Sequence, residues 1–356
     1  MRHRNRAQGW ETESGLTIGI DLGDKWSSYC VRGAEGEIRH EDRVRTNTVE
    51  LSRLLGGLQR SRMVLEVGTH SPWVSRLLES MGHEVIVANP RRVKLIAESD
   101  RKCDRVDASL LSELGQSLPR LLNAVRHRSA EAHEDLAVIR ARAGLVEVRT
   151  KLWNMLRSMA KSFGQRLPRK VTAAAIERYD RALKPLWEMI GAVTEKIEGY
   201  DREITRLAQT KYPEAIRLQQ VAGVGPLISL SFVLTIDYAQ RFHKSRHVGS
   251  YLGLRPRQRD SGDSQPQLRI TRAGDRYLRQ LLVQGAHYIL SAHGPDTDLK
   301  RWGKRLEGRG GRHAKQRAVV AVARKLAVLL HRLWVSEAAY EPLRQAPAAE
   351  AARVPV

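Results

Sequence analysis

Short apolar runs alternate with amphipathic stretches over the first 130 residues. The run Leu16–Ile20 predicts a strand, which a tight turn connects to a second strand that ends near Val31. Further strands are expected at 37–44, 62–67 and 84–88, with helices at 47–58 and 72–81. Strands alternating with helices indicate an α/β domain. Because the first three strands follow one another through short turns, we expect them to pair antiparallel, which argues against a purely parallel sheet.

From about Leu136 the pattern becomes helical. Apolar residues recur at steps of three and four up to Trp153, and a second series from Leu183 to Leu207 keeps the same steps, as in a heptad seam. These two faces predict a helical coiled-coil arm. Its seam could pair within the chain or between subunits, and we expect a role in oligomerisation. Further helices are expected at 214–236, 247–252, 272–291 and 315–334.

These patterns divide the chain into five parts. We expect a basic tail at 1–14, an α/β domain at 15–130, the arm at 131–212, a mainly α-helical domain at 213–340 and a disordered Ala/Pro-rich tail at 341–356. Arg324 and Lys325 interrupt one of the longest apolar stretches, so no membrane span is expected. The N-terminus lacks the apolar core of a secretory signal, and Cys30 and Cys103 have no metal-ligand spacing, so we expect a cytoplasmic protein.

Positive charge is concentrated in the last third of the chain. The 356 residues include 61 Lys and Arg against 39 Asp and Glu, a net charge of +22. Between Arg241 and Val335 there are 21 Lys and Arg and only 6 Asp and Glu. A solvated surface is one explanation, but the asymmetry favours nucleic-acid binding, for which the forked guanidinium of arginine is well suited. The candidate phosphate-binding residues are Arg255, Arg257, Arg259, Arg269, Arg272 and Arg276.

Four acidic residues lie beside apolar segments and are candidate metal ligands. Asp21 ends the first strand and Glu66 ends an interior strand. Asp104 and Asp107 are three residues apart, a spacing that places both on one helix face. Four carboxylates brought together require a divalent cation, and Mg²⁺ prefers such hard oxygen ligands. Taken singly, each acid could instead be a turn residue, an ion-pair partner or a helix N-cap.

The motifs around these acids resemble a known family. The first, I-G-I-D-L-G, is also similar to the phosphate loop of actin-like and sugar-kinase ATPases, but the second phosphate loop and the adenosine motif of those enzymes are absent. Taken together, the motifs are similar to the RuvC-like domain of the DEDD transposases of insertion sequences, which are bridge-RNA-guided recombinases. They are I-G-I-D-L-G at Asp21, V-L-E-V-G-T-H at Glu66, N-P-R-R-V-K at 89–94 and R-K-C-D-R-V-D-A at 101–108.

Two departures from the family pattern leave the acids in place. Cys103 stands where the family usually has threonine in K-T-D-x-x-D-A, and V-G-T follows Glu66 where A-T-G is common. The resemblance continues toward the C-terminus. The matching motifs there are G-V-G-P at 223–226, R-F-H-K-S at 241–245, Y-L-G-L-R-P at 251–256, D-S-G-D at 260–263 and R-I-T-R-A-G-D-R-Y-L-R at 269–279.

The resemblance implies a fold, a reaction and partners. It implies an RNase H-like N-terminal domain whose four acids hold Mg²⁺, and Ser261 as a nucleophile that forms a transient phosphoserine link to DNA. It also implies donor and target DNA, a structured guide RNA from the element, and a homodimer or tetramer. Ser264 is the alternative nucleophile, and a plain Ser-Gly turn is the structural alternative. Gly223 and Gly225 resemble a helix-hairpin-helix phosphate cradle, or form a simple turn.

Three functions remain open from the sequence. The first is a transposase that cleaves and rejoins DNA strands with the acids and Ser261. The second is a metal-dependent nuclease of the junction-resolvase type, in which water attacks and Ser261 is structural. The third is a nucleic-acid-binding protein with an inactive metal site.

Overall fold

The computed structural model describes residues 9–91, 93, 103–177, 180–266 and 268–344. The chain forms two compact units, residues 1–127 and 128–356. Most of the predicted basic tail and of the predicted C-terminal tail lies outside the described residues. The same holds for Arg92 and Lys94 of the N-P-R-R-V-K motif and for Arg101 and Lys102 of the R-K-C-D-R-V-D-A motif. Within the described part of the chain, no helix has the length and apolar content that crossing a membrane requires.

A mixed five-stranded sheet forms the centre of the N-terminal unit. In chain order its strands are β1 (Thr17–Asp21), β2 (Trp26–Arg32), β3 (Ile38–Arg45), β4 (Arg62–Glu66) and β5 (Glu84–Ala88), and their order in the sheet is β3-β2-β1-β4-β5. The first three strands pair antiparallel, whereas β4 and β5 run parallel to β1. This arrangement confirms the predicted α/β domain with an antiparallel start and is compatible with an RNase H-like fold.

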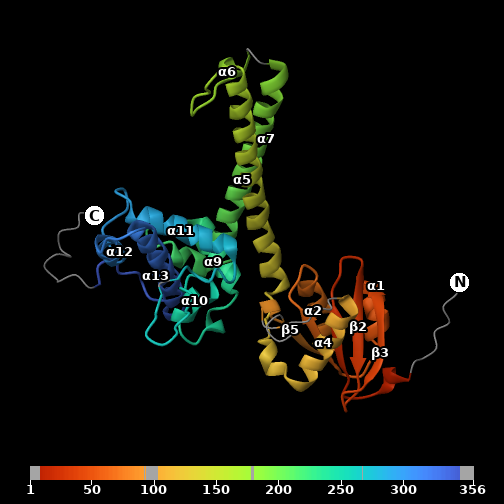
Figure 1. Cartoon of the computed structure of the whole chain (residues 1–356). Coiled ribbons are helices and arrows are strands. Elements are labelled where there is room, and N and C mark those ends of the chain that lie inside the picture. Colours follow the sequence, from red (N-terminus) through yellow and green to blue (C-terminus); the bar gives the residue numbers. More distant parts are fainter. Residues whose placement is uncertain (1–8, 92, 94–102, 178–179, 267, 345–356) are drawn as a thin grey trace. The chain divides into compact units, whose positions relative to one another are not determined.

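Helices cover both faces of the sheet (Figure 1). On one face lie α1 (Thr48–Leu55) and α2 (Ser71–Ser80), which bury apolar residues of β1 and β4 in the larger core of this unit. On the other face lies α4 (Asp104–Ser117), whose Leu111 and Leu114 pack against β4 and β5. Short 3-10 turns, η1 (Trp10–Thr12) and η2 (Pro119–Leu122), flank these elements.

Two glycines let α4 lie close to the sheet. A Cβ atom on Gly19 of β1 would lie 2.1 Å from the carbonyl oxygen of Ala108 and 2.4 Å from the amide nitrogen of Ser112. A Cβ on Gly115 would lie 2.2 Å from a methyl carbon of Val64. Backbone atoms cannot move aside as a flexible side chain can, so position 19 requires glycine. This contact fixes the position of α4 over β1.

The C-terminal unit begins with two long helices that lie side by side, α5 (Ala130–Ser162) and α7 (Asp180–Thr210), with α6 (Ala173–Glu177) near their far end (Figure 1). The seam predicted on α7 is buried within the chain at every seventh residue, namely at Leu183, Ile190, Ile197 and Ile204. Leu186, Val193 and Tyr200 in the same seam are half-buried. The seam therefore packs against the chain's own helices.

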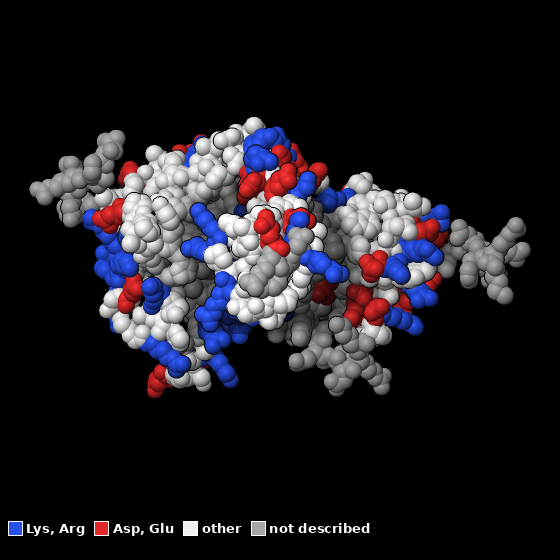
Figure 2. Space-filling model, turned by 90° about the horizontal axis from the view of Figure 1, so that it is seen from above, with Lys and Arg blue, Asp and Glu red and all other residues white. Residues whose placement is uncertain are grey.

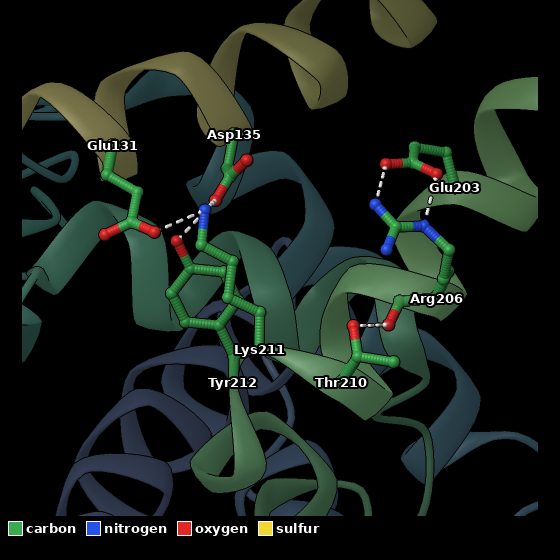
Figure 3. Close-up of polar contacts among 7 residues, drawn as sticks. All are labelled: Glu131, Asp135, Glu203, Arg206, Thr210, Lys211 and Tyr212. Atoms are coloured by element: carbon green, nitrogen blue, oxygen red, sulfur yellow. Dashed lines mark hydrogen bonds and ion pairs between the residues drawn. The ribbon is translucent and has the colours of Figure 1, made fainter.

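A polar cluster joins the two long helices at the base of the arm (Figure 3). Asp135 is 8% exposed and accepts hydrogen bonds from Lys211 Nζ at 2.5 Å and from the Tyr212 hydroxyl at 2.6 Å. Lys211 also pairs with Glu131 at 2.8 Å. These hydrogen bonds raise the pKa of Lys211, and burial together with the bond to Asp135 raises the pKa of Tyr212. The cluster fixes the start of α5 against the end of α7.

The remaining helices share one core with the base of the arm. They are α8 (Pro213–Leu218), α9 (Pro226–Ile236), the 3-10 turn η3 (Ala239–Arg241), α10 (Arg246–Tyr251), α11 (Arg276–Leu290), α12 (Asp298–Gly308) and α13 (Ala314–Ser336). The single helix predicted at 214–236 was wrong, because the chain turns at 219–225. The helix predicted from 272 begins at 276, where the Asp275 side chain accepts a bond from Leu278 N at 2.7 Å. The sequence did not predict α12.

Candidate active site and nucleic-acid interface

Two of the four candidate acids end neighbouring parallel strands. Asp21 is the last residue of β1 and Glu66 the last of β4, and each directly follows the last registered pair of the two strands, Ile20 and Leu65. Side chains alternate between the faces of a sheet, so Asp21 lies on the face of Gly19 and Glu66 on the face of Val64. Both lie on the α4 face of the sheet, and both are partly exposed.

The other two acids lie in the first turn of α4. The C-terminal part of this helix lies over the start of the parallel strands, because Arg62 Nη1 donates to the Gly115 carbonyl at 3.1 Å. Its N-terminal turn therefore lies toward the strand ends that hold Asp21 and Glu66. Asp104 is exposed and Asp107 half-buried. The free N–H groups of a first helical turn favour negative charge, which stabilises both carboxylates there.

The four acids have the chemistry of a Mg²⁺ site, since all supply hard carboxylate oxygens. In the described residues, however, no group of three or more His, Cys, Asp or Glu side chains lies close enough together to hold a metal ion. Asp21 and Glu66 each have a polar or electrostatic partner. The structure thus brings two acids to adjacent strand ends and two to one helical turn, and the four-ligand site stays a prediction.

The candidate nucleophile lies at the tip of an irregular hairpin. Ser261 and Ser264 exchange two backbone hydrogen bonds of 3.1 and 3.0 Å across a tight turn, in which Gly262 has a φ of +53°. Further down, Pro256 pairs with Ile270 and Arg257 N donates to the Arg269 carbonyl at 3.0 Å. We call residues 255–271 the serine hairpin. Both serines are exposed, and within the described residues no hydrogen bond is made by the hydroxyl of Ser261.

Exposed arginines without acidic partners surround this turn. The six candidate residues, Arg255, Arg257, Arg259, Arg269, Arg272 and Arg276, are all exposed, and no carboxylate of the described chain pairs with any of them. Arg255 instead donates to the Gln258 side chain. Figure 2 shows Lys and Arg atoms gathered on the C-terminal unit, where Asp and Glu atoms are sparser. The serine hairpin therefore presents a net positive charge to solvent, because its four arginines outnumber Asp260 and Asp263.

The two candidate glycines of the α8–α9 turn differ. Gly223 has a φ of +82°, and a Cβ there would lie 3.0 Å from the Gly285 carbonyl oxygen, so close packing against α11 accounts for this glycine. Gly225 is exposed, caps α9 and has open space around a built Cβ. Gly225 is therefore the more accessible of the two to a phosphate.

Comparisons with known proteins agree with this architecture. The family model described as Transposase IS116/IS110/IS902 family matches residues 215–301, and the DEDD transposase model of IS110 matches residues 18–164. The transposase for insertion sequence element IS1111A of Coxiella burnetii is 28% identical over 339 residues, which cover 91% of this chain and 90% of the relative. The probable family 20 transposase of Pseudomonas aeruginosa is 28% identical over 343 residues, which cover 91% and 98%. The chain belongs to the DEDD transposases of insertion sequences.

The DEDD family assignment bears on both candidate sites. It implies that the transposase depends on a divalent metal, which matches the chemistry of the four acids. The first family match includes the serine hairpin, and the second includes nearly the whole sheet, α4 and all of α5. Each candidate site therefore lies within a segment that is typical of the family.

Trp26, Arg43 and Arg45 form a cluster that the sequence did not predict. The guanidinium carbons of Arg43 and Arg45 each lie 5.1 Å from the ring centroid of Trp26, which is 44% exposed. Two arginines two residues apart on a strand share one face, so the sequence contained a signal for Arg43 and Arg45. Their proximity to Trp26 depends on strand register and was not visible in the sequence.

Proposed function

We propose that this transposase cleaves and rejoins DNA strands with a carboxylate site at the sheet end and Ser261 as nucleophile. The observation that supports it most is the common face of Asp21, Glu66 and α4 at the end of two parallel strands. The alternative, a metal-dependent nuclease without a covalent step, uses the same acids and a water molecule in place of Ser261.

The acids would hold a divalent ion, for which Mg²⁺ is the candidate. Asp21 and Glu66 would hold the ion from the strand ends, and Asp104 and Asp107 would hold it from α4. When bound, such an ion neutralises charge on a phosphate and activates an oxygen. The chain's own contribution is to hold the carboxylates on a rigid support, because strand pairing and the close contact at Gly19 limit their movement.

Ser261 would attack a DNA phosphate through its Oγ atom. One phosphorus–oxygen bond forms with Oγ and the bond to one deoxyribose oxygen breaks, and that oxygen leaves as a free hydroxyl. The serine proton passes to a base or to water. Because a phosphodiester replaces a phosphodiester, the energy for rejoining is retained in the link. Arg257 and Arg259, beside the turn, would offset charge on the phosphate oxygens.

We further propose that a structured guide RNA selects the sites and that the transposase acts as a homodimer or tetramer. Pairing by RNA leaves the protein to hold sugar-phosphate backbone. Six exposed arginines without acidic partners in the described chain suit this task, since backbone contacts carry no sequence information. An RNA of one defined length that copurifies with the transposase would support this part, and a preparation that recombines DNA without RNA would contradict it.

The carboxylate site is tested by Asp21→Asn in a DNA-strand cleavage assay. We expect a loss of about 100-fold or more, the effect of losing a metal's contribution of several kcal/mol. The matched control is Asp24→Asn, in the turn that follows β1, where the side chain is 91% exposed. Equal activity of Asp21→Asn and wild type would contradict the assignment.

The serine step is tested by trapping the protein–DNA link. Ser261→Ala should bind DNA and form no covalent adduct, whereas Ser264→Ala should form one. A tryptic peptide that carries a nucleotide on Ser261 would identify the link directly. Cleavage and strand exchange by Ser261→Ala at the wild-type rate would favour the metal-dependent nuclease.

A further inference from the structure

The edge of the N-terminal sheet carries an aromatic and arginine cluster of Trp26, Arg43 and Arg45. Trp26 begins β2 and lies opposite Arg45 of β3 in the strand register, and Arg43 lies opposite Ser28. Each guanidinium carbon lies 5.1 Å from the indole centroid. No ion pair is formed by either guanidinium among the described residues, so both charges remain available to a phosphate.

The strand register places this cluster beside the candidate acids. Asp21 pairs with Ser28, and Ser28 pairs with Arg43, so Asp21 and Arg43 lie in one row across three strands. Neighbouring strands are separated by about 4.8 Å, which puts the two backbones roughly 10 Å apart. Residues directly opposite one another point to the same face of a sheet. Arg43 therefore lies on the face of Asp21, and Arg45 and Trp26 lie on that face at the same end of the sheet.

We propose that Trp26, Arg43 and Arg45 bind an unpaired segment of the DNA strand that is cleaved at the acids. A nucleobase would stack on the indole ring, and the two guanidiniums would contact the flanking phosphates. Trp26 exposes 44% of its surface although large aromatic side chains are normally buried, and stacking on aromatic rings with nearby cations is the common means of holding single-stranded nucleic acid. The distance of about two strand spacings lets one DNA strand reach both the cluster and the acids.

The choice of DNA over RNA follows from position. This proposal rests on the proposed function in one respect, which is that the DNA strand is cleaved at Asp21 and Glu66. A strand that is unpaired where it is cleaved exposes its bases beside that site, and exposed bases stack on aromatic side chains. The cluster offers that surface on the same face.

A photochemical cross-link tests the contact directly in the full-length wild-type protein. The probe is a single-stranded oligothymidylate that carries iodouracil, and the adduct is located by peptide mass spectrometry. We expect an adduct on Trp26. An RNA oligomer of the same length that carries iodouracil should give a weaker adduct on Trp26. Adducts found elsewhere but never on Trp26, or on Trp26 with RNA alone, would overturn the proposal.

Substitutions give a second readout. Trp26→Ala should weaken binding of oligothymidylate about fivefold or more, while Trp26→Phe retains most of the affinity. The double variant R43A/R45A should lower the slope of log affinity against log salt by about 1.4, or 0.7 for each charge removed. The control is Arg39→Ala on the same strand, where the guanidinium already pairs with Glu37 at 2.7 Å and Glu13 at 3.2 Å. If Arg39→Ala lowers the salt slope as much as R43A/R45A does, Arg43 and Arg45 are not the phosphate-binding residues.

The cross-link also separates this proposal from the proposed function. Asp21→Asn should lose cleavage and keep the Trp26 adduct if both are correct. Asp21→Asn could lose cleavage while no form of the protein gives a Trp26 adduct. That result would support the acids as the cleavage site and refute DNA binding by the cluster. A Trp26 adduct with full cleavage by Asp21→Asn would refute the acids alone.

Discussion

The sheet end of the N-terminal unit and the serine hairpin of the C-terminal unit hold their functional groups in opposite ways. Asp21 and Glu66 end paired strands, and α4 lies so close to β1 that position 19 accommodates no side chain. Ser261 lies at an exposed turn closed by two backbone hydrogen bonds. The carboxylates are thus placed by strand pairing and helix packing, whereas the Ser261 side chain is exposed and its hydroxyl makes no hydrogen bond among the described residues.

The two sites also differ in the charged side chains around them. At the sheet end, Asp21 and the arginines of β3 lie on one face, so the proposed metal ligands and the proposed phosphate-binding side chains are neighbours. Around Ser261, six exposed arginines have no acidic partner among the described residues. A surface of this kind attracts a polyanion, and phosphates that neutralise it would also order the hairpin. DNA binding would therefore order the serine hairpin more than the carboxylates at the sheet end.

The largest effect on stability is expected at the rigid site. Gly19→Ala places a methyl group 2.1 Å from the Ala108 carbonyl oxygen and should lower the free energy of unfolding by about 3 kcal/mol, the upper part of the usual range for overpacking. Chemical denaturation measures this. The control is Gly57→Ala in the same unit, where nothing lies within 4 Å of a built Cβ. A Gly19→Ala protein as stable as the control would show that α4 is not held closely against β1.

The base of the arm should show the next largest effect. Asp135→Ala leaves the Tyr212 hydroxyl without its acceptor and Lys211 with Glu131 alone, at a cost of about 1–3 kcal/mol. Thermal unfolding measures the change. Glu131→Ala removes a carboxylate that is 69% exposed and should cost less than about 1 kcal/mol. If the two variants are equally stable, the cluster in Figure 3 does not hold the helices together.

A buried histidine makes the C-terminal unit sensitive to mild acid. His331 of α13 is 1% exposed and bonds to the Ala239 carbonyl at 2.8 Å and to Ser245 Oγ at 3.0 Å. Burial lowers the pKa of His331, so below the ordinary pKa of about 6.5 the unfolded chain binds a proton that the folded chain excludes. The free energy of unfolding should fall as pH drops through that value.

Denaturation curves at pH 7 and pH 5.5 measure the effect of His331, and His331→Gln should show less dependence on pH. A protein that gains stability over this interval, with the variant unchanged, would contradict the assignment of a neutral buried imidazole.

The smallest effect on stability is expected for a substitution in the serine hairpin, which should instead weaken DNA binding. Arg257→Ala should change the free energy of unfolding by less than about 0.5 kcal/mol, as is usual for exposed side chains. The salt slope for duplex DNA should fall by about 0.9 for each phosphate that the variant no longer neutralises. Fluorescence anisotropy across a salt series measures it. A large loss of stability with no change in slope would make the hairpin structural.

The sequence predicted those features that depend on local periodicity. Apolar runs with acids at their ends located the strands and the positions of Asp21 and Glu66, and the heptad steps located α7. Tertiary packing decided the rest. The predicted helix at 214–236 is broken at Gly223, which has a positive φ and packs against Gly285 of α11. The pairing of Trp26 with Arg43 and Arg45 depends on register across two strands, which one sequence does not reveal.

Binding of a divalent metal to the DNA-bound transposase tests directly whether Asp21 and Glu66 are metal ligands, because it requires no turnover. Calorimetric titration with Mg²⁺ or Mn²⁺ should show saturable binding in wild type and in Asp24→Asn, and a large loss in both Asp21→Asn and Glu66→Gln. The ion should also stabilise the N-terminal unit in the two proteins that bind it, by an amount that rises with the logarithm of the ratio of ion concentration to Kd. Wild-type affinity retained in both Asp21→Asn and Glu66→Gln would contradict the claim that the acids at the sheet end form the metal site.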